Sequence, residues 1–73
     1  MCPITAVPEG REVTVALVAG GSAASRRLTE LGLVPGRIVA VMQNSGGPLL
    51  LRLGDSRFAL GKGVAEKVFV KDD

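Results

Sequence analysis

Apolar residues recur at every second position in several short stretches of the chain. Between residues 12 and 18, Val13, Val15 and Leu17 fall on one face of an extended chain and are predicted to be buried together. This period of two is typical of a β-strand with one buried face. Further apolar runs predict strands at residues 37–43, 49–53, 56–60 and 67–70.

The stretch at residues 22–31 has a different spacing, with Ala24, Leu28 and Leu31 at intervals of four and three. This spacing places the three side chains on one face of an α-helix. Ser22 follows two glycines and is predicted to cap the helix, because its hydroxyl accepts a backbone N–H that the first turn leaves unpaired. A helix of about ten residues is too short to be stable alone in water, so it is expected to lie on the rest of the fold.

The residues that follow predict where this helix ends. Gly32 stands where a left-handed C′ residue is needed, since it has no Cβ to clash. Leu33 is then expected to contact Leu28, as in the apolar pair of a Schellman motif. Pro35 cannot continue a helix, and together with Gly36 it is predicted to form a turn.

The predicted elements follow the order strand, helix, three strands, one helical turn at residues 61–66, and a closing strand. Gly54 and Asp55 form a two-residue link between apolar runs, which is typical of a β-hairpin. Many short strands and turns favour a small barrel. The prediction is therefore a mainly β fold, an SH3-like barrel of about five strands with a short α-helix inserted after the first long strand. In the lead-in segment, Ile4 and Val7 are expected to tuck onto the core.

The composition limits the possible functions. The 73 residues are expected to form one domain, spanning residues 1–73, with 47% hydrophobic residues to fill its core. The net charge is +2 without a block of like charge, and two phenylalanines are the only aromatic residues. Both features argue against nucleic-acid binding, which uses a basic stripe and stacking aromatics. No signal peptide or membrane span is recognisable in the sequence, so a cytoplasmic location is expected.

One cysteine, Cys2, and the absence of histidine exclude several kinds of site. Neither a Ser–His nor a Cys–His nucleophile pair can form, and the usual Cys/His zinc site is also impossible. Gly20-Gly21-Ser22 lacks the Lys-Ser/Thr ending of a P-loop and is interpreted as a turn before a capped helix. The sequence thus predicts no catalytic residue, no cofactor and no metal site, and a protein that is not an enzyme.

Gly20-Gly21 and the later run Arg27-Leu28-Thr29-Glu30-Leu31-Gly32-Leu33-Val34-Pro35-Gly36 resemble the signature of the FeoA family. Members of this family are small cytoplasmic accessory proteins of bacterial ferrous iron transport. The resemblance implies an SH3-like barrel with a helical insertion. It also implies a partner, the cytosolic GTPase-bearing portion of the FeoB-type permease, whose activity the protein would support or modulate. Contact with the membrane is then expected only through the permease, and the protein is expected to be a monomer or a weak homo-oligomer.

The helix and its exit loop are the predicted surface for this partner. Apolar anchors surrounded by arginine are favoured at protein interfaces. The predicted contact residues are Arg26, Arg27, Glu30, Leu33 and Val34. A structural role is predicted instead for Ser22, Leu28, Leu31, Gly32, Pro35 and Gly36.

Two alternative classes of function stay open at the level of the sequence. One is a small SH3-like barrel associated with nucleic acid or the ribosome, against which the scattered charge and missing aromatics count. The other is a metal-responsive switch that oligomerises on metal binding, against which the shortage of histidine and cysteine ligands counts.

Overall fold

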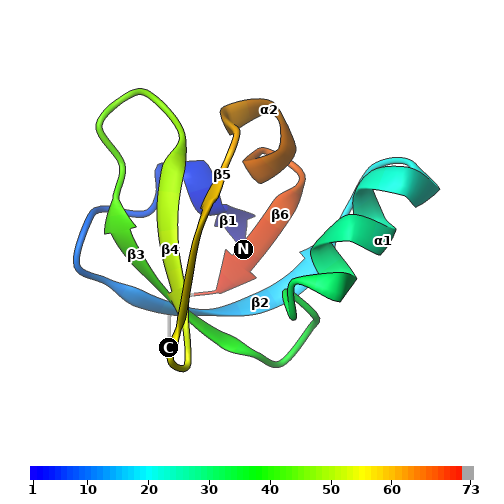
Figure 1. The fold of residues 1–73 in the computed structure, drawn as a ribbon, viewed down its shortest axis with the longest axis horizontal. Coiled ribbons are helices and arrows are strands. Elements are labelled where there is room, and N and C mark those ends of the chain that lie inside the picture. The colour runs from blue at the N-terminus through cyan, green and yellow to red at the C-terminus, as the bar shows by residue number, and fades with distance from the viewer. Residues whose placement is uncertain (72–73) are drawn as a thin grey trace.

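The computed structural model describes residues 1–71, and its strands form one antiparallel sheet with helices at its edges (Figure 1). The sheet has six strands in the order β1-β6-β2-β3-β4-β5. The mainly β architecture and the helix inserted after the first long strand agree with the prediction. The elements are β1 (Cys2–Pro3), the 3₁₀ helix η1 (Ile4–Ala6), β2 (Glu12–Val18), α1 (Ser22–Glu30), β3 (Ile38–Gln43), β4 (Leu49–Leu53), β5 (Ser56–Leu60), α2 (Lys62–Ala65) and β6 (Val68–Lys71).

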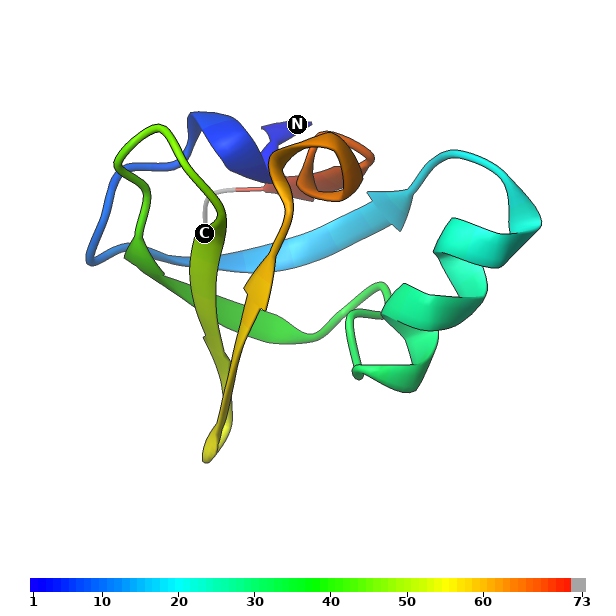
Figure 2. The same ribbon diagram turned by 45° about the horizontal axis from the view of Figure 1, so that its top comes forward.

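The sheet curls around a core without joining its two end strands by hydrogen bonds. β1 and β5 stand at opposite ends of the strand order. The short helices η1 and α2 contact each other, and Figure 2 shows them side by side between these two ends of the sheet. Helical turns therefore complete the barrel where strand pairing does not, which shields part of an otherwise open sheet edge.

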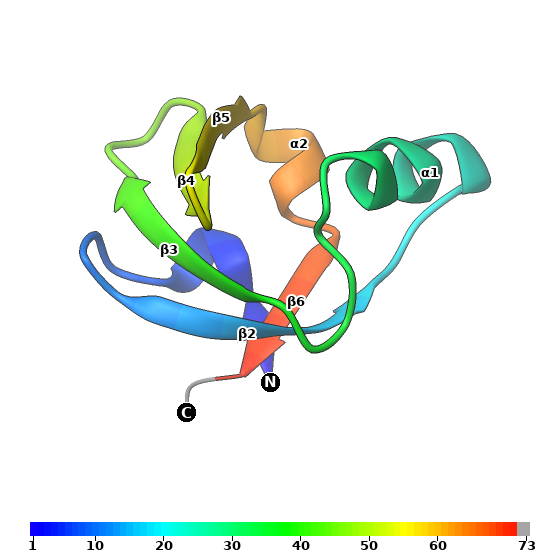
Figure 3. The same cartoon turned by 60° about the horizontal axis from the view of Figure 1, so that its bottom comes forward.

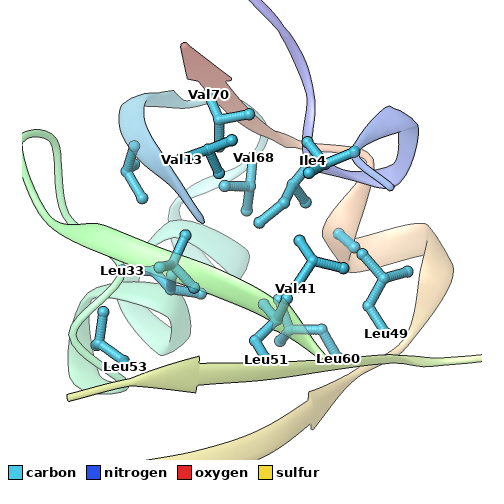
Figure 4. Packing of buried hydrophobic residues seen from close by; sticks show 14 of the residues in the cluster. Ile4, Val13, Leu33, Val41, Leu49, Leu51, Leu53, Leu60, Val68 and Val70 are labelled. Carbon is cyan, nitrogen blue, oxygen red and sulfur yellow. The ribbon is translucent and has the colours of Figure 1, made fainter. Parts of the chain in front are cut away.

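The core is aliphatic and draws on almost every element of the fold (Figure 4). Ile4 and Val7 are buried, as predicted for the lead-in segment. The sequence did not predict β1 or η1, because a two-residue strand and a single 3₁₀ turn carry no periodic pattern. The buried cluster consists of Ile4, Val7, Val13, Val15, Leu28, Leu33, Val39, Val41, Leu49, Leu51, Leu53, Leu60, Ala65, Val68 and Val70.

The predicted alternation in the first long strand holds only for its first half. Val13 and Val15 are buried, but Leu17 is 39% exposed, so its predicted burial is wrong. The reason is a register shift against β6: Val15 pairs with Val70, whereas Leu17 pairs with Phe69. The extra residue in β2 is a β-bulge, which reverses the faces of the side chains that follow it. The neighbour of Leu17, Val18, packs against the core instead.

The N-cap of α1 lies one residue earlier than predicted. The N-cap is Gly21, whose backbone is extended with φ −71° and ψ 165°, and Ser22 is the first helical residue. The predicted cap at Ser22 is therefore wrong, and its hydroxyl lies outside the described part of the structure. Glycine is also tolerated at the N-cap because it adopts the required extended backbone readily.

The predicted end of α1 is confirmed in detail. Gly32 has φ 93°, and its N–H donates to the carbonyl of Thr29 at 2.9 Å. The N–H of Leu33 donates to the carbonyl of Leu28, also at 2.9 Å, which completes the Schellman pair of bonds. The side chains of Leu28 and Leu33 are both fully buried in the same core cluster, as the expected apolar contact requires.

The turn after the helix is also confirmed. The N–H of Arg37 donates to the carbonyl of Val34 at 3.1 Å, and Gly36 has φ 94°. Pro35 and Gly36 thus occupy the two central positions of a type II turn, which favours proline first and requires a positive φ second. The Gly36 N–H also donates to the Val15 carbonyl at 2.9 Å, which ties the turn to β2.

Candidate functional site

The α1 helix stands at the side of the barrel (Figure 3). Leu28 is fully buried, and Leu31 packs against the core from a half-buried position, as the helical spacing predicted. Ala24 is half-buried on the same face. These residues and the exit loop anchor α1, while Ala23, Arg26, Arg27, Thr29 and Glu30 are exposed.

The open surface of α1 is charged. Arg26, Arg27 and Glu30 are all exposed, in agreement with the prediction. Neither arginine forms an ion pair with any residue that the structure describes. No described carboxylate pairs with these arginines, which leaves their guanidinium groups available to a partner.

The exit loop contributes less to this surface than predicted. Leu33 is fully buried in the core cluster and donates the backbone bond of the Schellman motif, so it cannot contact a partner from its place in the core. Its assignment as a contact residue is corrected to a structural one. Val34 is half-buried and remains partly accessible. We define the helix patch as Arg26, Arg27, Glu30 and Val34.

A polar clip that the sequence did not predict joins the loop after β3 to the segment before β2. The Asn44 side-chain amide donates to the carbonyls of Thr5 at 3.0 Å and Val7 at 2.9 Å. The Glu9 carboxylate accepts the backbone N–H of Asn44 at 2.7 Å and the Ser45 hydroxyl at 3.1 Å. The backbone bond from Asn44 and then the Ser45 hydroxyl hold the pKa of Glu9 below its usual value, because both stabilise the charged carboxylate.

This clip serves the fold, since all its partners belong to the chain itself. The residues lie 35 or more positions apart in sequence, and no local pattern brings them together. Among residues 1–71, no group of three or more Cys, Asp and Glu side chains lies close enough to hold a metal ion. Cys2 is a free, exposed thiol. No helix in this part of the chain is long and apolar enough to cross a membrane.

The strand order and the inserted helix define a class of small SH3-like barrel that carries a helix between its first two long strands. A family model described as the FeoA domain matches residues 2–72, and this chain belongs to the FeoA family. The resemblance seen in the sequence is thereby confirmed.

Comparisons with individual proteins support this family assignment. The chain is 35% identical over 72 residues to the "Putative Fe(2+) transport protein A" of Methanocaldococcus jannaschii, a match that covers 99% of this chain and 88% of that protein. A crystal structure of an iron uptake regulatory protein (FeoA) superposes with a TM-score of 0.87 at 36% identity, covering 96% of this chain and 93% of that one.

A second similar structure adds the fold name. FeoA of Stenotrophomonas maltophilia, complexed with zinc and described as an SH3 domain protein, gives a TM-score of 0.83 at 34% identity over 93% of this chain and 87% of that one. The predicted SH3-like fold is therefore confirmed. A manganese-dependent transcriptional repressor also matches, with a TM-score of 0.89 at 18% identity over 97% of this chain and 41% of that one, which shows a shared fold alone.

Proposed function

We propose that this chain is a non-enzymatic accessory protein of ferrous iron transport, which works in the cytoplasm by binding the GTPase-bearing cytosolic portion of a FeoB-type permease. Membership of the FeoA family supports the link to iron transport. The name of the M. jannaschii relative also supports it, as does the role in activating ferrous iron transport that has been suggested for the S. maltophilia protein. Fe²⁺ is, in this proposal, the cargo of the permease.

The observation that carries the proposed contact is the helix patch. The barrel holds α1 by the face that carries Leu28 and Leu31. Its other face presents Arg26 and Arg27, which make no ion pair with a described residue. Arginine is favoured at protein interfaces because its planar guanidinium donates several hydrogen bonds and its stem packs on apolar surface.

Action by binding also agrees with the chemistry of the chain. The sequence has no histidine, so none can serve as a general base beside a serine or cysteine. Any effect on GTP hydrolysis would then come from the conformation of the permease that the complex favours. The proposal therefore requires a direct complex between this chain and the permease's cytosolic portion.

The test is a charge reversal on α1. The double variant Arg26→Glu with Arg27→Glu changes two exposed side chains, and its free energy of unfolding should stay within about 0.5 kcal/mol of the parent. We expect it to lose most of its binding to the permease's cytosolic portion in calorimetry, and to fail to restore ferrous iron uptake in cells that lack the native protein.

The matched control is Lys62→Glu with Lys71→Glu, which makes the same change in net charge at exposed positions outside α1 and its exit loop. This control should bind and complement like the parent. Normal binding by the α1 variant would refute the helix patch. If only the control variant lost binding, the contact would lie on the side of α2 and β6 instead. If neither the parent nor either variant formed a complex with the permease's cytosolic portion, the proposed partner would be refuted.

A further inference from the structure

The outer face of the sheet carries a groove away from the core. A concave space of about 400 Å³ lies over β2, β3 and β4, next to the turn that follows α1. We call it the sheet groove and define it by its lining residues, which are Glu12, Gly36, Arg37, Ile38, Ala40, Arg52 and Gly54. None of these residues belongs to the helix patch.

The strand register places several groove residues in one row. Ala40 pairs with Glu12 on one side and with Arg52 on the other. Arg52 Nη2 lies 3.7 Å from Glu12 Oε2, so this ion pair spans the small side chain of Ala40 between them. Both charged side chains are well exposed to solvent, which makes such a pair weak. The floor of the groove is therefore the methyl group of Ala40, which lies beneath the weak ion pair of Glu12 and Arg52.

The same row ends in a like-charge pair. Arg52 on β4 pairs directly with Arg57 on β5. Like charges that face each other across two strands destabilise a sheet. Neither Arg57 nor the nearby Arg37 forms an ion pair with any of residues 1–71. The groove lining thus holds two arginines, Arg37 and Arg52, against the carboxylate of Glu12, and Arg57 and Asp55 stand next to it on the β4–β5 hairpin. Three arginines against two carboxylates leave a positive excess, which favours an anionic partner.

An apolar residue stands in the middle of these charges. Ile38 is 60% exposed on β3, although antiparallel sheets usually turn polar residues to solvent. Gly36 and Gly54 line the groove beside it and leave open space, since a Cβ at either position would meet no atom within 4 Å. An aliphatic surface with free space next to it fits an incoming apolar side chain.

From these features we infer that the sheet groove binds an extended acidic peptide segment with one apolar anchor, a function beyond the proposed contact of α1 and independent of it. The anchor lies on Ile38 in the space beside the glycines, and flanking carboxylates pair with Arg37 and with Arg52 and Arg57. Alternate residues of an extended chain face the same side at a spacing of about 7 Å, which suits an acidic–x–apolar–x–acidic pattern.

A peptide fits this surface better than a nucleic acid does. Single-stranded nucleic acids are held by stacking on aromatic side chains as well as by positive charge. The groove lining contains no aromatic residue, and its one exposed apolar side chain is the branched aliphatic Ile38. Contact with an aliphatic side chain and ion pairing with carboxylates are both properties of a peptide.

The test uses the capped peptide Ser-Glu-Thr-Leu-Thr-Glu-Ser, which presents two carboxylates and a leucine on one face when extended. Titration into the ¹⁵N-labelled chain at low salt should shift the amide signals of residues 36–40, 52–54 and 57 and leave those of 22–30 unchanged. A peptide with serine in place of leucine, and one with lysine in place of both glutamates, should each bind about tenfold more weakly or worse.

The exposed groove residues Arg37 and Ile38, and Arg57 opposite Arg52, supply the matching protein variants. Arg37→Glu with Arg57→Glu should weaken the peptide about tenfold or more, whereas Arg26→Glu with Arg27→Glu on α1 should leave the Kd within about twofold. The Ile38→Ser variant should bind the leucine and serine peptides with the same Kd, because the leucine anchor has lost its contact with Ile38. The amide spectrum of each variant verifies that it is folded.

Several results would overturn the inference. These are an absence of localised shifts at millimolar peptide, shifts centred on α1, or equal shifts with the lysine peptide. An oligothymidylate that binds the groove as tightly as the peptide would show a general anion site instead. Groove signals that move with protein concentration in the absence of peptide would assign the groove to a second copy of this chain.

Discussion

Replacing Gly32 with alanine tests how α1 is attached to the barrel. Gly32 has φ 93°, a conformation that a residue with a Cβ rarely adopts. A Cβ at this position would also lie 2.7 Å from Cδ2 of Leu53, far inside normal contact distance. Leu53 is buried in the core cluster, so its side chain has little room to move away.

The expected loss has two parts. The left-handed backbone costs a residue with a side chain about 1–2 kcal/mol. Forcing an added methyl into a packed core typically costs about 1–3 kcal/mol more. We therefore expect Gly32→Ala to lower the free energy of unfolding by about 2–5 kcal/mol. Small domains have roughly 0.05–0.15 kcal/mol of stability per residue, so this loss is a large fraction of the total.

The free energy of unfolding is measured by urea unfolding followed by circular dichroism. Alanine variants of two other glycines separate the backbone cost from the packing cost in this assay. Gly36 has φ 94° but no atom within 4 Å of an added Cβ, so Gly36→Ala should lose only the backbone share of about 1–2 kcal/mol. At Gly47 the φ is not positive and the space is open, so Gly47→Ala should stay within about 0.5 kcal/mol of the parent.

The comparison can refute each step. Equal losses at Gly32 and Gly36 would show that the contact with Leu53 contributes nothing, and that the close approach relaxes at no cost. A Gly32→Ala protein as stable as the parent would refute the left-handed helix end itself, together with the Schellman bonds assigned to Leu33 and Leu28.

Two further predictions concern charge and metal. Because hydrogen bonds lower the pKa of Glu9, this residue stabilises the folded state above the ordinary carboxyl pKa, and the stabilisation is lost as the pH falls through its lowered value. Urea melts should show the parent more stable than Glu9→Gln at pH 7, with the gap closing below about pH 4; a gap independent of pH would contradict this. The isolated monomer should bind neither Fe²⁺ nor Zn²⁺ tightly, because the sequence has one cysteine and no histidine. A one-to-one site of micromolar affinity or tighter in calorimetry would prove this wrong.

Local patterns in the sequence predicted the parts of the fold that depend on neighbouring residues. The end of α1 is the best example, since Gly32, Leu33, Pro35 and Gly36 each have a conformational preference that acts within a few residues. The strands were found for the same reason, because a period of two is visible wherever one face is buried.

Features that depend on distant partners could not be predicted in this way. The exposure of Leu17 results from a bulge against β6, which lies some fifty residues later in the chain. The bonds from Asn44 to Thr5 and Val7 likewise join segments that only the folded sheet brings together. The sequence predicts two roles for Leu33, a helix stop and a partner contact, and burial in the core allows only the first.

The sheet groove was missed for a related reason. Its row of Glu12, Ala40 and Arg52 exists only through the pairing of three strands. In the sequence, Ile38 was one apolar residue in an alternating strand, and alternation alone does not tell which of its two faces is turned to the core.

The turn at residues 34–37 connects the two proposed surfaces. Val34 belongs to the helix patch, while Gly36 and Arg37 line the sheet groove. Two backbone hydrogen bonds fix this turn to Val15 of β2. The Gly36 N–H donates to the Val15 carbonyl, and the Val15 N–H donates to the Arg37 carbonyl, each at 2.9 Å. A change at Gly32 therefore disturbs the support of both surfaces, and a loss of binding in that variant would identify neither. Only substitutions of exposed side chains, such as Arg26 on α1 or Arg57 beside the groove, can distinguish a contact residue from a residue that holds the contact surface in place.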